Sequence, residues 1–348
     1  MRALVGTRKG LLVFEQKNST WALTRAHFDG VKCNYAVHDP KHKKVWAGVN
    51  HGHWGPKLHF STDNGKTFKE LDPPKFPEGG KDTLKDFWAL QSDRKGRIWL
   101  GVEPAALFYS DDEGTRWNLC EGLYRVPGKD KWFGAATDAH CLHSLMIDPA
   151  DDQHILVGIS VAGMLETRNG GATWKYINKG MKADFLPDPD NEVGQDPHMT
   201  VMAPSDPNVL WQQNHCGLFK SEDMGQSWAD LSKAKGVKSA FGWGIVVDEE
   251  DAKTAYTVPA ASDVNRTPFK KRLFVQKTRD GGRSWKTLDK GLPKETCYDI
   301  VYRHALALQE SQLMFGSTTG NLYFSRNDGE SWKELGLHLP PIYSVKLF

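Results

Sequence analysis

The repeated units of this 348-residue chain can be aligned on their Asp-Pro turns. In that alignment, four histidines and one glutamate fall at two positions of the repeat. That alignment brings the start of one strand and the end of the next to the same opening, which gathers His51, Glu103, His143, His198 and His215. Imidazoles together with a carboxylate are the ligands expected for zinc, manganese, iron or copper. We therefore predict that a divalent transition metal binds to the four histidines.

Further residues near this opening could take part in catalysis or hold a substrate. Glu103, His140 and Arg303 are the predicted catalytic groups, since carboxylates and imidazoles transfer protons and a guanidinium can orient a substrate. The residues predicted to bind substrate are three tryptophans and an asparagine, namely Trp54, Trp88, Trp243 and Asn214. Asp138 is a candidate for orienting a ligand, and His53 could replace a histidine ligand if the alignment shifts. Neutral histidines in a water-filled channel could also act as general bases without a metal.

The strands that position these residues are marked by an eight-residue pattern that occurs six times. Its copies are STDNGKTF, SDDEGTRW, TRNGGATW, SEDMGQSW, TRDGGRSW and SRNDGESW, beginning at residues 61, 110, 167, 221, 278 and 325. The third residue is Asp or Asn, which can accept hydrogen bonds from N–H groups one or two residues later. The fifth is always glycine, which tolerates the positive φ of a tight turn between strands. The aromatic at the end is expected to pack between neighbouring sheets. Because the pattern recurs in six units, we interpret its carboxylates as structural and not catalytic.

The spacing of the pattern, about 50 residues, is typical of a propeller or a solenoid. Residues 2–21 have the same strand-turn-strand shape without the pattern, which raises the number of units to seven. The last stretch, residues 341–348, is an alternating strand with no unit of its own. We predict an all-β fold: a seven-bladed β-propeller of four-stranded blades over residues 1–348, one domain, closed by the C-terminal strand joining the N-terminal blade.

Four longer insertions interrupt the repeats, at residues 73–85, 124–139, 184–197 and 261–271. All four are predicted to enter or leave the same side of the propeller. Because binding residues concentrate on loops held by a rigid scaffold, we expect that side to be the binding face.

The eight-residue pattern is the Asp box, and the chain resembles the Asp-box (bacterial neuraminidase repeat) propellers over nearly its whole length. Such propellers include sialidases, some xyloglucanases, sortilin-type receptors and photosystem II assembly factors. Their chemistries differ, so the resemblance implies the fold and leaves the site to be argued separately. Residues 124–127 (YRVP) look like the arginine motif that opens the sialidase domain, but they lie in an insertion after the second box. The other sialidase residues have no matching positions that we can assign.

Composition excludes some classes of partner. Charged residues make up 25% of the chain and give a formal net charge of +2, so nothing favours nucleic acid or an anionic membrane. No apolar stretch resembles a signal peptide or a membrane span, and the five cysteines lack CxxC spacing. We expect a cytoplasmic protein with reduced thiols.

Three functions remain open from the sequence. The first is a metal-dependent hydrolase or lyase that acts on a small polar substrate at the histidine-lined channel mouth. The second is a non-catalytic propeller that binds or assembles a protein partner. The third is a sialidase-like glycoside hydrolase, which needs two carboxylates facing each other across a cleft.

Overall fold

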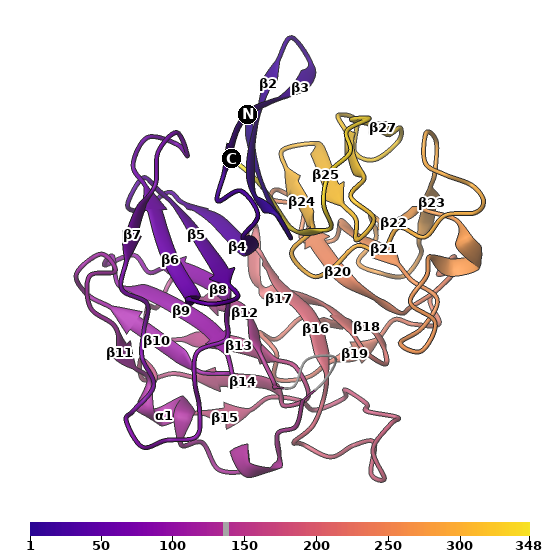
Figure 1. The fold of residues 1–348 in the computed structure, drawn as a ribbon. Coiled ribbons are helices and arrows are strands. Elements are labelled where there is room, and N and C mark those ends of the chain that lie inside the picture. Colours follow the sequence, from indigo (N-terminus) through magenta and orange to yellow (C-terminus); the bar gives the residue numbers. More distant parts are fainter. Residues whose placement is uncertain (135–138) are drawn as a thin grey trace.

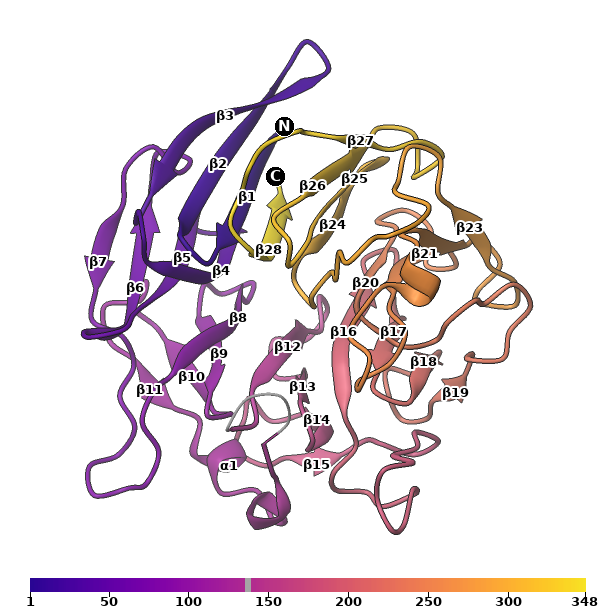
Figure 2. The same ribbon diagram turned by 45° about the vertical axis from the view of Figure 1, so that its right-hand side comes forward.

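The computed structural model describes residues 1–134 and 139–348. Its strands form seven four-stranded antiparallel sheets within these residues, arranged as the blades of a seven-bladed β-propeller (Figures 1 and 2). The first blade contains both ends of the described chain, from the channel outward β28 (Ile342–Leu347), β1 (Arg2–Thr7), β2 (Gly10–Lys17) and β3 (Thr20–His27).

The other blades follow in chain order, and each runs from the channel to the rim. Their strands are β4 (Lys32–Asp39), β5 (Lys44–His51), β6 (Gly55–Ser61) and β7 (Lys69–Leu71); β8 (Asp86–Ser92), β9 (Ile98–Glu103), β10 (Leu107–Ser110) and β11 (Asn118–Leu119); β12 (Leu142–Ile147), β13 (Ile155–Ile159), β14 (Gly163–Thr167) and β15 (Lys175–Tyr176); β16 (Pro197–Ala203), β17 (Asp206–Asn214), β18 (Gly217–Ser221) and β19 (Ala229–Asp230); β20 (Gly242–Val247), β21 (Ala255–Pro259), β22 (Val275–Thr278) and β23 (Lys286–Leu288); and β24 (Leu306–Gln309), β25 (Gln312–Gly316), β26 (Leu322–Ser325) and β27 (Lys333–Glu334). Helical structure in the described residues is confined to α1 (Glu121–Tyr124) and two 3-10 turns, Lys129–Lys131 and Phe269–Lys271.

The ring closes as the sequence predicts. Strand β28 pairs antiparallel with β1, with Val345 opposite Val5 and Lys346 opposite Leu4. Figure 2 shows the two ends side by side in one blade. A blade built from both ends leaves no open sheet edge at the junction, which stabilises the ring.

The eight-residue turns connect the third and fourth strands of their blades, at the outer rim. In the copy at 221–228, the Ser221 hydroxyl donates to Asp223 Oδ1 at 2.7 Å and accepts the Gly225 N–H at 2.8 Å. Asp223 Oδ1 accepts the Ser227 N–H at 2.9 Å. The carboxylate thus reaches a donor four residues on. The predicted donor, an N–H one or two residues after the aspartate, was wrong because the Gly225 N–H donates to the serine hydroxyl instead.

The aromatic that ends each turn connects neighbouring blades. Trp228 is buried in a cluster that joins the blade of β16 to the blade of β12. Its backbone N–H donates to the Lys179 carbonyl at 2.9 Å, and its indole N–H donates to the Ile177 carbonyl at 2.9 Å. Gly180 follows at φ +93°, where an added Cβ would overlap the Trp228 carbonyl oxygen. The backbones of the two blades are therefore in direct contact at this glycine.

Replacing Gly180 with alanine should therefore weaken the propeller. The left-handed backbone and the backbone overlap together should lower the free energy of unfolding by about 3 kcal/mol. Gly30→Ala is the matched control, because Gly30 has φ +83° but no atom within 4 Å of an added Cβ. We expect the control to lose only about 1 kcal/mol in urea unfolding. Equal losses for both variants would show that the contact between blades contributes nothing.

Candidate functional site

One end of the axial channel widens into a cavity of about 610 Å³. Each of the four predicted insertions supplies part of its wall, through Lys85, Phe133, Phe185, Asp263 and Arg266. The rest of the wall comes from the starts of inner strands, the segments before them and the ends of second strands. It includes, among the predicted site residues, Trp88, Glu103, His198, His215, Trp243 and Arg303.

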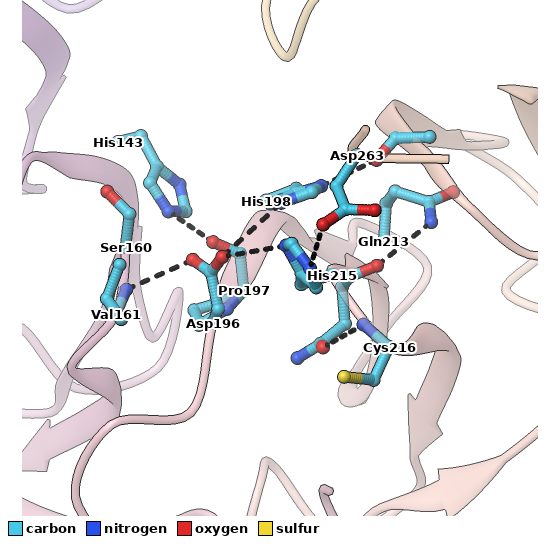
Figure 3. Close-up of polar contacts among 12 residues, drawn as sticks. His143, Ser160, Val161, Asp196, Pro197, His198, Gln213, His215, Cys216 and Asp263 are labelled. Atoms are coloured by element: carbon cyan, nitrogen blue, oxygen red, sulfur yellow. Dashed lines mark hydrogen bonds and ion pairs between the residues drawn. The ribbon is translucent and has the colours of Figure 1, made fainter. Parts of the chain in front are cut away.

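Three of the lining residues, Asp196, His198 and His215, have converging ligand atoms (Figure 3). Asp196 Oδ2 lies 3.5 Å from His198 Nε2 and 3.3 Å from His215 Nδ1. One ligand atom from each residue lies within 4.8 Å of the other two, and no other group of three or more such residues is found in the described part of the chain. A carboxylate with two imidazoles is a donor set suited to a divalent transition metal.

Each of the three ligand residues is oriented by a further partner on its other side. These partners are the Val161 N–H, 3.0 Å from Asp196 Oδ1; the Gly242 carbonyl, 2.6 Å from His198 Nδ1; and the Asp263 carboxylate, 3.5 Å from His215 Nε2. A carbonyl can only accept, so His198 Nδ1 carries the proton. When the ring is neutral, its Nε2 therefore presents a lone pair toward Asp196. Such partners fix the tautomer and direction of metal-binding histidines.

The charges of the cluster are set by burial and by mutual contact. Burial lowers the pKa of His198, although Asp196 acts in the opposite direction. Burial alone would raise the pKa of Asp196, but contacts with His198 and His215 hold it well below its ordinary value. The Asp196 contact is also the main cause that raises the pKa of His215. An ionised carboxylate thus faces one neutral imidazole and one imidazole that binds a proton readily.

His143 supports this cluster from behind. It is fully buried, and its Nε2 donates to the Pro197 carbonyl at 2.8 Å (Figure 3). Its Nδ1 lies 2.9 Å from the Ser144 hydroxyl, so both ring nitrogens are occupied. Because Pro197 stands between Asp196 and His198, His143 holds the backbone on which two ligand residues sit. His143, a predicted metal ligand, therefore supports the cluster through this backbone contact and is not one of its three ligand residues.

His51 and Trp54, also predicted for the site, lie together away from the cluster. His51 ends β5, and its Nδ1 accepts the His53 N–H at 3.2 Å. Its ring is near the rings of His53 and Trp54, and Trp54 is 75% exposed. None of the three lines the 610 Å³ cavity. The four predicted histidine ligands therefore do not form one group in the described residues.

Asn214 and His140 have local partners. The Asn214 amide donates to Gln212 and accepts the Cys216 N–H, both at 2.9 Å, which shapes the turn that carries His215. His140 Nδ1 accepts the Ala105 N–H at 3.0 Å. Neither residue lines the cavity. Asp138 lies outside the described residues.

Across the cavity, Glu103 is buried and accepts a hydrogen bond from the Trp88 indole at 3.0 Å. Burial is the main cause that raises its pKa, and nearby Asp86 adds to the effect. The Arg303 guanidinium lies 5.6 Å from the centre of the Trp88 ring. A carboxyl that binds a proton readily thus faces the same cavity as the ionised Asp196.

Sequence reasoning missed Asp196 and Asp263. Asp196 stands two residues before His198, and that spacing at a strand start was the available signal. Asp263 belongs to the insertion at 261–271, whose path over the cavity has no signature in the sequence.

Acid should destabilise the protein partly through His140. Burial, and secondly the nearby Lys129, lower its pKa from 6.5 to about 4, while Asp82 acts in the opposite direction. The folded state thus resists a proton that the unfolded chain accepts. This contribution to stability is complete above about pH 6.5 and is lost as the pH falls toward 4. Because the ring is partly exposed, we expect a loss of about 1–2 kcal/mol.

His140→Asn, which keeps an acceptor for the Ala105 N–H, should reduce this loss in urea unfolding between pH 7 and about 4. His338→Asn, at an exposed histidine, should behave as the unmodified protein. An unchanged pH dependence in His140→Asn would contradict the assignment.

No helix in the described residues is long and apolar enough to cross a membrane.

Comparisons with known proteins connect the chain to other propellers. No family model matches it. It is 21% identical over 281 residues to an oligoxyloglucan-reducing end-specific xyloglucanase of Emericella nidulans, covering 79% of this chain and 30% of that protein. The chain therefore spans about a third of the length of this relative.

Two solved structures share the fold. An ancestral GH74 enzyme aligns with a TM-score of 0.58 at 16% identity, over 84% of this chain and 36% of that one. YCF48 bound to D1 peptide aligns with a TM-score of 0.58 at 13% identity, over 94% of this chain and 88% of that one. At these identities the structural similarity shows the propeller fold alone. The activity has to be inferred from the residues of the site.

Proposed function

We propose that the protein is a metal-dependent enzyme, a hydrolase or lyase, whose metal binds to Asp196, His198 and His215. The observation that carries this proposal is that all three ligand atoms converge while the other side of each residue is held by a separate partner. Three protein ligands leave coordination positions for water or substrate, as in catalytic zinc sites. The protein is expected to be cytoplasmic.

The residues around the metal position have complementary roles. A bound divalent ion would polarise a substrate oxygen or activate a water molecule. Glu103, held by the Trp88 indole and with a raised pKa, can donate or accept a proton near neutral pH. Arg303 offers a cation to a polar or anionic part of the substrate. The rings of Trp88 and Trp243 line the cavity and exclude water from one side of a small molecule.

Metal content measures this proposal directly. Protein purified without an affinity tag and equilibrated with zinc, manganese, iron or copper should retain about one equivalent of at least one metal. Asp196→Asn and His215→Gln should each lose most of that metal. His51→Gln is the control, since His51 lies outside the cluster, and it should retain the metal as the unmodified protein does. Less than about a tenth of an equivalent, or equal loss in the control, would refute the site.

A glycoside hydrolase is the second candidate, favoured by the xyloglucanase relative and by two of the carboxylates that line the cavity, Glu103 and Asp196. The environments of Glu103 and Asp196 shift their pKa values in opposite directions, as expected for a general acid and an ionised partner. This reading predicts hydrolysis of xyloglucan oligosaccharides that survives EDTA and falls at least about a hundredfold in Glu103→Gln. Activity that EDTA abolishes would favour the metal enzyme instead. A protein that binds no metal and hydrolyses no glycoside would match the third possibility, a non-catalytic binding propeller.

A further inference from the structure

A second cavity, of about 510 Å³, occupies the other part of the axial channel. Residues from each of the blades' inner strands line it, β4, β8, β12, β16, β20, β24 and β28. Arg303 and His304 line both cavities and so form the boundary between them. The His304 ring lies 5.0 Å from the Tyr35 ring and 6.3 Å from the Trp88 ring, so this turn reaches across the channel toward other blades.

The charged groups of this second cavity have one sign. Arg303 and Lys346 line it, and no carboxylate does among the described residues. Neither cation forms an ion pair with a carboxylate of residues 1–134 or 139–348. The acids that act on them from a distance are Asp196 for Arg303 and Glu249 for Lys346. Lys346 is exposed, so an anion can reach it, and two cations without a paired carboxylate attract an anion to this part of the channel.

Three polar atoms at the same place lack a hydrogen-bond partner within the described chain. They are Arg303 Nε, His304 Nε2 and the buried Ser344 Oγ. His304 and Ser344 are neighbours across a parallel bridge, and Lys346 follows Ser344 by two residues on the same strand. Buried polar atoms in proteins are nearly always satisfied by a partner or a bound molecule. His304, Ser344 and Lys346 therefore lie along one stretch of the channel, and Arg303 lies at its boundary with the first cavity.

We propose that this second cavity binds the oxyanionic group, a phosphate or a carboxylate, of a small molecule. Arg303 supplies a planar guanidinium, Lys346 an ammonium and Ser344 a hydroxyl, which together match the acceptors of such a group. The cavity is large enough for a small organic molecule attached to that group. The three metal-binding residues do not line this cavity, and Arg303 is the one anion-binding residue that it shares with the first cavity. The proposal therefore rests on Lys346 and Ser344 and does not depend on the proposed enzyme activity.

Calorimetric titration of metal-free protein with inorganic phosphate, and separately with acetate, tests the proposal. One of the two anions should bind with a stoichiometry near one, and the preferred anion identifies the group. Lys346→Gln should weaken that binding at least about tenfold, and Lys346→Arg, which keeps the charge, should restore it to within about threefold. Lys333→Gln, at an exposed lysine of β27, should bind as the unmodified protein.

Variants at the metal cluster separate this site from the first one. His215→Gln should bind the preferred anion as tightly as the unmodified protein, while Lys346→Gln should retain metal. Binding of neither anion, or equal binding by Lys346→Gln and the unmodified protein, would overturn the proposal. If Lys346→Gln does not fold, Lys346→Met provides the same test of charge, and unchanged binding by that variant would likewise overturn it.

Discussion

The pairing of β28 with β1 is the interaction on which the rest of the molecule depends. It joins residues from opposite ends of the described chain in one sheet and closes the ring of blades. The same strand also holds the turn before β24, because the Val345 N–H donates to the His304 carbonyl at 2.7 Å. Ring closure therefore also positions Arg303 and His304, the two residues that divide the channel. A propeller with a loose junction would lose both cavities together.

Within that ring, backbone carbonyl groups orient several of the ionisable side chains. His198 is directed by the Gly242 carbonyl, and the segment before it is held by His143 through the Pro197 carbonyl. The ring of His198 also stacks on Trp243, with centroids 5.8 Å apart and planes 11° from parallel. Such fixed surroundings hold the cluster ready for a ligand, since little reorganisation is needed on binding. The two parts of the channel then differ in their acidic groups: carboxylates line the first cavity, whereas the second contains Arg303 and Lys346 without a carboxylate among its described lining residues.

The fold could be predicted from the sequence because its signal is repeated. The eight-residue turn, the first unit that lacks it and the last strand without a unit of its own were sufficient to predict the number of blades and the closure of the ring. The site was predicted less completely, because alignment on turns places backbone positions and not side-chain directions. His198 and His215 were found together, whereas His143 turns toward Pro197 and His51 lies with His53 and Trp54. Asp196 was missed because a single Asp before a strand is common, and only the fold shows that it faces two imidazoles.

The central claim is that Asp196, His198 and His215 form one metal centre. Anomalous diffraction from crystals equilibrated with zinc is the most direct measurement of it. We expect one strong peak at about 2.0–2.2 Å from Asp196 Oδ2, His198 Nε2 and His215 Nδ1. A peak beside His51 and His53 instead would contradict this claim. So would the absence of a peak at the cluster in crystals whose zinc is fully bound at another position.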